Sequence, residues 1–117
     1  MESILTSVKK ALGITEDYEH FDADLIMHIN SVLNILTQIG VGPKAGFQIE
    51  DKDATWGDFI DDVRLNMVKS YVSMRVKLMF DPPQSSSAAE AMNNICKELE
   101  WRLNVTVDPE ENNPLKA

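Results

Sequence analysis

Cysteine pairs, long apolar runs and a basic N-terminal leader are all missing from this sequence of 117 residues. A single cysteine, Cys96, cannot form a disulfide within the chain. No apolar run approaches the ~20 residues that a membrane-spanning helix needs, and no secretory signal is evident at the start of the chain. These absences fit synthesis in a reducing, intracellular compartment and predict no membrane partner.

The chain has fewer basic residues than acidic ones. Eleven lysines and arginines stand against 19 acidic residues, which gives a net charge of −8. Proteins that bind nucleic acid through its phosphate backbone gain affinity from a basic surface, so the balance argues against a general phosphate-backbone binder. The same deficit disfavours binding to an anionic membrane surface.

Side chains with the spacing of a catalytic or metal site are also lacking. The two histidines, His20 and His28, are eight residues apart and have no third nitrogen or sulfur ligand nearby. The acids between Glu50 and Asp62 do not follow the spacing of a calcium loop. No glycine-rich loop carries the lysine that binds phosphate. We therefore predict no metal, no cofactor and no catalytic residue.

Apolar residues make up 44% of the chain, enough for one domain that folds alone. Their spacing predicts an all-α fold, a small four-helix bundle-like domain over residues 1–104 with an extended or disordered tail over 105–117. The predicted helices cover residues 3–12, 22–39, 57–80 and 87–104. The expected signals at their ends are the caps Ser3 and Asp22, the capping box Ser87–Glu90, and the terminating glycines Gly13 and Gly40.

A long loop over residues 41–55 joins the second and third predicted helices. Phe47 and Ile49 alternate with polar residues there, which allows a short strand or β-hairpin. Loops of this length in a small domain are often functional, so both residues are candidates for a contact with another molecule.

The third predicted helix carries a local basic stretch on an acidic protein: Arg64, Lys69, Arg75 and Lys77, with no acid from residue 63 to 80. Two apolar stripes on this helix, one of which includes Val63, indicate a central position or packing on a second molecule. Two interpretations of the basic residues stay open. The heads of Arg64 and Arg75 pair with acids of the same chain while their stems lie at the edge of the core, or the basic surface meets the acidic face of a neighbouring subunit.

The fourth predicted helix carries one cysteine and one tryptophan with different expected roles. Cys96 lies beside its apolar stripe, the predicted core face that includes Ile95, and is expected to be a small buried hydrophobe. Trp101 projects away from that stripe. Exposed tryptophan is enriched at binding hot spots, so we favour an interface role over the alternative that the tail folds back over it.

The order of these segments resembles the small head–tail connector (adaptor) proteins of long-tailed bacteriophages. The resemblance spans residues 4 to 103. It rests on a first helix ending in Leu12-Gly13-Ile14, an acidic linker, a helix opening Asp24-Leu25-Ile26, and a long helix running into Phe80-Asp81-Pro82-Pro83, followed by Glu98-Leu99-Glu100-Trp101-Arg102-Leu103.

The resemblance implies a structural role without catalysis, at the head–tail interface of the virion. Such proteins bind the portal ring after DNA packaging and form a ring, usually twelve-fold, that extends the DNA channel and receives the stopper or tail-completion protein. DNA would be channel content only. Assembly would take place in the host bacterial cytoplasm, and the free protein can be monomeric. Terminal segments commonly reach toward the portal in this family, which adds Val105 and Val107 to the candidates.

The candidate contact residues for the portal or a neighbouring subunit are therefore Arg64, Lys69, Arg75, Lys77, Trp101, Phe47, Ile49, Val105 and Val107. The competing interpretation is a small nucleic-acid-associated helical module, a regulator or packaging subunit, that uses the basic stretch. A small enzyme ranks third, because no nucleophile–base spacing appears.

Overall fold

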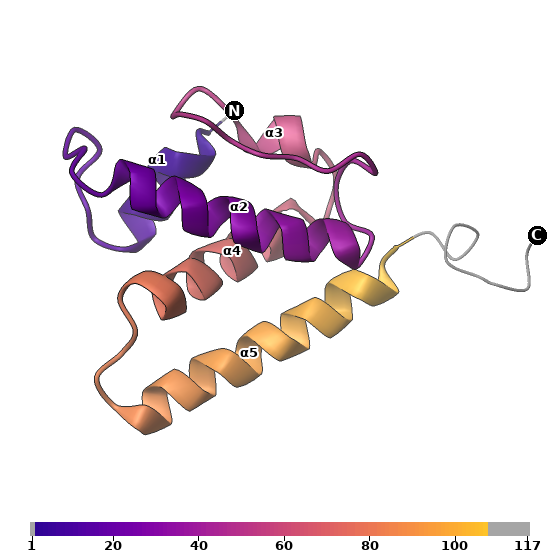
Figure 1. Cartoon of the computed structure of the whole chain (residues 1–117). Helices are drawn as coiled ribbons and strands as arrows, with labels where there is room; N and C mark the ends of the chain where they lie inside the picture. Colours follow the sequence, from indigo (N-terminus) through magenta and orange to yellow (C-terminus); the bar gives the residue numbers. More distant parts are fainter. Residues whose placement is uncertain (1, 108–117) are drawn as a thin grey trace, which may run out of the picture.

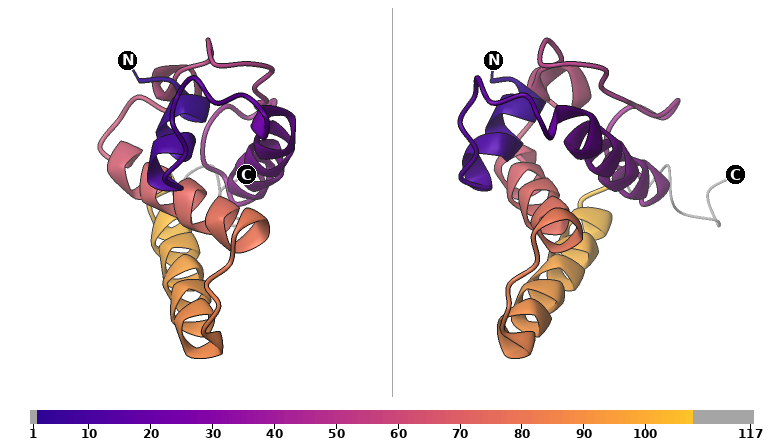
Figure 2. Two further views of the ribbon diagram at one scale, coloured as in Figure 1. Left: turned by 90° about the vertical axis from the view of Figure 1, so that its left-hand side faces the viewer. Right: turned by 60° about the vertical axis from the view of Figure 1, so that its left-hand side comes forward.

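The computed structural model describes residues 2–107, and within them all regular structure is helical, which confirms the all-α prediction (Figure 1). The helices are α1 (Ile4–Ala11), α2 (Asp22–Gln38), α3 (Trp56–Phe59), α4 (Leu65–Phe80) and α5 (Ser86–Val105). Helix α4 packs against α1, α2 and α5. The first half of α5 extends beyond the other helices, as all the views show (Figure 2).

The core lies where α1, α2 and α4 meet. Helix α2 supplies its largest share, because apolar residues recur there at steps of three and four. The fully buried side chains from these three helices are Ile4, Val8, Leu25, Ile29, Val32, Leu33, Leu36, Val68, Tyr71, Val72 and Val76.

Helix α1 begins and ends as predicted. The Ser3 side chain accepts a hydrogen bond from the Thr6 amide at 3.2 Å, and Gly13 follows the helix with a φ of 78°. Asp22, in contrast, is the first helical residue of α2 and not its N-cap; Phe21 holds that position with no side-chain cap. The Asp22 carboxylate lies 2.9 Å from the ammonium of Lys9 instead, because that buried charge needs a counter-ion.

No strand or hairpin forms between residues 41 and 55, so that expectation is wrong. The side-chain amide of Asn30 takes the place of a partner strand: its Nδ2 donates to the Ile49 carbonyl at 3.0 Å, and the Ile49 amide donates to its Oδ1 at 2.7 Å. Ile49 is buried, and Phe47 is half-buried with its ring 5.6 Å from that of Phe59. Both residues therefore belong to the core of the domain.

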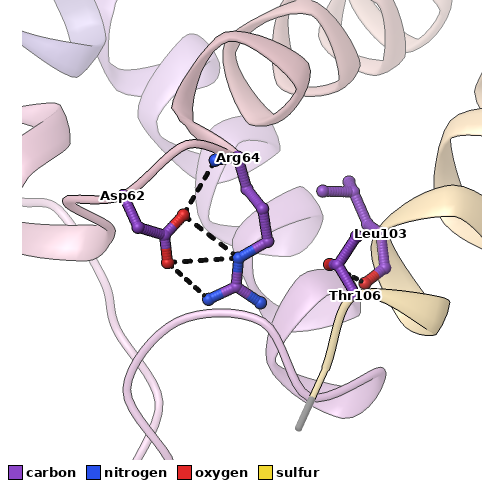
Figure 3. Close-up of polar contacts among 4 residues, drawn as sticks. All are labelled: Asp62, Arg64, Leu103 and Thr106. Atoms are coloured by element: carbon purple, nitrogen blue, oxygen red, sulfur yellow. Dashed lines mark hydrogen bonds and ion pairs between the residues drawn. The ribbon is translucent and has the colours of Figure 1, made fainter.

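The predicted helix over 57–80 is two helices. Thr55 and Asp58 form a capping box that starts α3, and the backbone then turns extended at Ile60, with a φ of −151°. Asp62 accepts from the Arg64 amide at 2.8 Å and from its guanidinium, and this turn redirects the chain into α4 (Figure 3). Val63, placed by the prediction on an apolar stripe, lies in the turn and is 98% exposed.

The last helix also differs from the prediction in where it begins and in which of its residues are buried. Ser85, not Ser87, is the N-cap, and its hydroxyl accepts from the Ala88 amide at 3.3 Å. Cys96 and Leu103 are the buried residues of α5, whereas Ile95, predicted for the core face, is exposed.

Helix α5 ends one residue later than predicted, at Val105, and the chain then packs back on the domain. The Thr106 hydroxyl donates to the Leu103 carbonyl at 2.6 Å (Figure 3), and Val107 is buried over Gly40. The first residues of the predicted tail thus continue the domain, and residues 108–117 lie outside the described part of the chain.

Two glycines of the 41–55 loop provide a matched test of how closely the loop packs on Phe59. Gly42 and Gly46 share a positive φ, of 88° and 92°, but a Cβ on Gly42 would lie 2.5 Å from the Phe59 ring, whereas one on Gly46 would meet nothing. Gly46→Ala should lower the free energy of unfolding by about 1 kcal/mol through backbone strain alone. Gly42→Ala should lower it by a further ~1–3 kcal/mol, because the added methyl group overpacks the contact with Phe59. Urea unfolding measures both, and equal losses would contradict the close packing on Phe59.

Candidate assembly surfaces

The cations of the basic stretch, which lie on α4 and just before it, form ion pairs with acids of the same chain. Each of its four cations has an acidic partner: Arg64 with Asp62 at 2.7 Å, Lys69 with Glu2 at 3.0 Å, Lys77 with Asp81 at 3.6 Å, and Arg75 with Glu100. The hydrogen bonds from Arg64 lower the pKa of Asp62 below its ordinary value. The geometry matches the first of the two interpretations, in which the cationic heads pair with acids of the same chain.

The Arg75 pair joins α4 to α5. Its Nε donates to the Tyr71 hydroxyl at 3.2 Å, and its Nη2 donates to Glu100. Burial raises the pKa of Tyr71 to about 12. Cys96 is buried nearby, and burial raises the pKa of its thiol too, so it is the small apolar core residue that was expected. This network fixes how α5 lies along α4.

The side of α5 opposite the core is a partly apolar surface, which we call the outer face. Trp101 is 66% exposed, Val105 56% and Ile95 44%. Trp101 and Val105, four residues apart, lie on the same side of the helix, and Ile95 lies at the edge of that side, about 120° from Trp101. Glu98 and Arg102 form an exposed pair between them at 3.2 Å. The expectation that Trp101 projects away from the core is confirmed. Such an apolar surface on an exposed helix is typical of a contact with another molecule.

A second surface, which we call the α4–α5 groove, lies on a different side of α5. It is a hollow of about 580 Å³ where α2, the end of α4 and the first half of α5 meet. Apolar side chains dominate its lining: Ile35, Leu78, Met79, Pro82 and Ala89, with Asn93 beside them. Glu90 and Arg75 bring charge to it. This groove was not predictable from the sequence, because it depends on how far α5 folds back along α4.

An acidic surface covers the opposite end of the molecule. The linker between α1 and α2 and the loop before α3 border a hollow of about 800 Å³. Two lysines, Lys9 and Lys52, also line it. Its carboxylates are those of Glu16, Asp17, Glu19, Asp22, Glu50 and Asp51. Over residues 2–107, no group of three or more histidine, cysteine or acidic side chains is arranged to hold a metal ion. Acids outnumber lysines around this hollow, so the surface is negatively charged.

The sequence-predicted contact residues thus fall into three groups. Trp101 and Val105 are exposed on the outer face. Phe47, Ile49 and Val107 pack on the domain core, so we do not keep them as contact residues. The four basic residues are partly exposed but paired, as described above.

A family model for phage connector proteins matches residues 4–110, nearly the whole chain. The chain belongs to the phage connector protein family. No curated protein and no solved structure matches it. This assignment confirms the resemblance noted from the helix order and from the Phe80–Pro83 segment.

Membership gives this connector a head–tail role in a phage particle, as a member of a family of structural proteins that interact with other head and tail components. None of the helices in residues 2–107 is apolar over a length that could cross a bilayer.

Burial of the Tyr71 hydroxyl predicts an alkaline loss of stability. Because the pKa of Tyr71 is about 12 in the folded connector against an ordinary 10.0, the unfolded chain releases this proton first. The free energy of unfolding should therefore fall as the pH rises from about 10 to 12, by at most about 1.4 kcal/mol per pH unit. Below pH 10 this group should contribute no pH dependence.

Urea unfolding across this pH range measures the effect, with Tyr71→Phe as the control that removes it. The phenolate absorbance of the Tyr18→Phe variant follows Tyr71 directly, since the chain has two tyrosines. An unchanged slope in Tyr71→Phe would show that other groups cause the loss.

Proposed function

We propose that this connector binds the portal ring once DNA is packaged and assembles there into a ring, usually twelve-fold, that extends the DNA channel. The far side of the ring receives the stopper or tail-completion protein. The family match over residues 4–110 carries this proposal. The exposed Trp101 and Val105 support it, because an assembly protein needs apolar surface outside its own core.

The acidic character of the chain suits a channel wall. With a net charge of −8, the connector would repel the phosphates of the passing genome and not retain it. We propose that part of the acidic surface described above faces the channel, that encapsidated DNA is channel content and not a ligand, and that the protein works without catalysis or cofactor. Assembly would take place in the host bacterial cytoplasm, on heads that already contain DNA.

A nucleic-acid-associated module is the second candidate, and the basic stretch around α4 is the observation that favours it. The pairing of Arg64, Lys69, Arg75 and Lys77 with acids weakens this candidate, since neutralised cations release few counter-ions from DNA.

Co-sedimentation with DNA-filled, tailless heads from the same phage separates the two candidates. Saturable binding, seen by electron microscopy as a ring at the portal vertex, is the result that the connector role requires. Absence of binding at near-physiological salt, together with salt-dependent binding to free duplex DNA, would favour the nucleic-acid module.

Trp101→Ala should weaken assembly and leave the fold intact. The side chain is two-thirds exposed in the monomer, so its loss should change the free energy of unfolding by about 0.5 kcal/mol or less. If the Trp101 side chain anchors a contact, its truncation should weaken the binding free energy by about 2 kcal/mol or more, which is roughly a 30-fold loss of affinity for tailless heads.

Tyr18→Ala is the matched control, because Tyr18 is a 49% exposed aromatic residue in the α1–α2 linker, away from α5. Sedimentation with heads measures affinity, and urea unfolding measures stability. Equal affinities for Trp101→Ala and the unmodified protein would remove the outer face from the assembly surface.

A further inference from the structure

Helix α5 presents two unlike apolar surfaces on different sides. The outer face carries Ile95, Trp101 and Val105, toward its C-terminal end. The α4–α5 groove is bordered by Ala89 and Asn93, toward its N-terminal end. When two unlike surfaces of one chain fit each other, copies add head to tail, and the result is a ring if the rotation closes. Two copies related by a two-fold axis would instead bring like surfaces together.

The shapes of the two surfaces are complementary. Trp101 is a projecting indole, and the groove is a concave, mainly apolar hollow of about 580 Å³. Within residues 2–107 no side chain fills the groove and none covers the indole. Seating the indole in the groove would remove both apolar surfaces from water, which is the main driving force of association.

The charges beside these surfaces are complementary too. Glu90 lies at the groove and is exposed, and within residues 2–107 it has no ion-pair partner. Arg102 lies next to Trp101 on the outer face, and its pair with Glu98 is exposed on both sides, so that pair contributes little. An arginine that accompanies the indole into the groove region would reach a carboxylate that lacks a cation.

We infer that the occupant of the α4–α5 groove is a second copy of this chain. Trp101 of one copy seats in the groove of the next, and Arg102 pairs with the neighbour's Glu90. This contact rests on the proposed ring and names the surfaces that build it. It places α5 at every subunit boundary, with its outer face on one neighbour and its groove on the other.

The size of the contact explains why the ring would need a template. One tryptophan buries about 150–250 Å². A stable interface takes roughly 800 Å² from each partner. A contact centred on Trp101 alone therefore leaves the free protein monomeric. Copies held side by side on a portal gain a high effective concentration, and the same contact then forms.

Cross-linking in assembled particles tests the inference. The background is Cys96→Ala, which removes the one native thiol. Met79→Cys places a thiol at the groove, and Glu98→Cys places one beside Trp101 without removing it. Particles that carry both changes in each chain are treated with a short bismaleimide and analysed on a denaturing gel. We expect a ladder of dimers, trimers and higher multiples, because each copy links to two neighbours.

Met27→Cys with Glu98→Cys is the matched control, since Met27 is an exposed methionine on α2 that does not border the groove. It should give no ladder. Dimers from Glu98→Cys alone would mean that like surfaces meet and would overturn the inference. Absence of a ladder from Met79→Cys with Glu98→Cys, with the connector present in the particles, would overturn it and leave the connector role standing. Absence of the unmodified chain from purified particles would overturn both.

A charge exchange provides a second test that does not depend on the cross-linker. Glu90→Arg and Arg102→Glu should each reduce incorporation into particles about tenfold, because each places like charges opposite one another. The two changes in one chain should restore incorporation, since the pair is then reversed. Circular dichroism of the purified variants verifies the fold. A double variant as poor as the single ones would contradict the Arg102–Glu90 contact.

Discussion

Helix α4 must bury apolar side chains on two sides, and the rest of the structure is arranged around that requirement. On one side Tyr71, Val72 and Val76 are fully buried, and on the other Met67, Met74 and Leu78 are partly buried against the core. Helices α1 and α2 cover part of this surface, and α5 folds back after the Asp81–Pro83 turn to cover the rest. Because α5 has only α4 as an extensive neighbour, most of its own surface stays in solvent. The exposed outer face is a consequence of this single-sided packing.

The polar network between α4 and α5 determines where that outer face lies. Arg75 bonds to both Tyr71 and Glu100, so the rotation of α5 about its own axis is fixed by a charged contact as well as by Cys96 and Leu103. Rotation by one residue would bury Ile95 and expose Cys96. The same contact keeps Trp101 outward.

The periodicity of apolar residues predicted the all-helical fold and most of the core, whereas it did not predict three other features. The break at Ile60 falls inside an apolar pattern, and the Asp62–Arg64 turn that redirects the chain is a side-chain contact that periodicity cannot detect. The Asn30 amide that holds Ile49 lies 19 residues away in the chain. The start of α5 depended on which of three adjacent serines caps the helix. Trp101 was predictable because a tryptophan outside any apolar stripe has no core position to fill.

A charged surface and an apolar surface have different consequences for an assembly protein of this size. The cations around α4 already have acidic partners, so a neighbour that used them would first have to separate existing pairs. Trp101 has no such competing contact in the described part of the chain, and its desolvation is favourable wherever an apolar hollow meets it. Association through Trp101 therefore separates no ion pair of the monomer except the exposed Arg102–Glu98 pair, whereas association through Arg75 would disrupt the Arg75–Glu100 pair that joins α4 to α5.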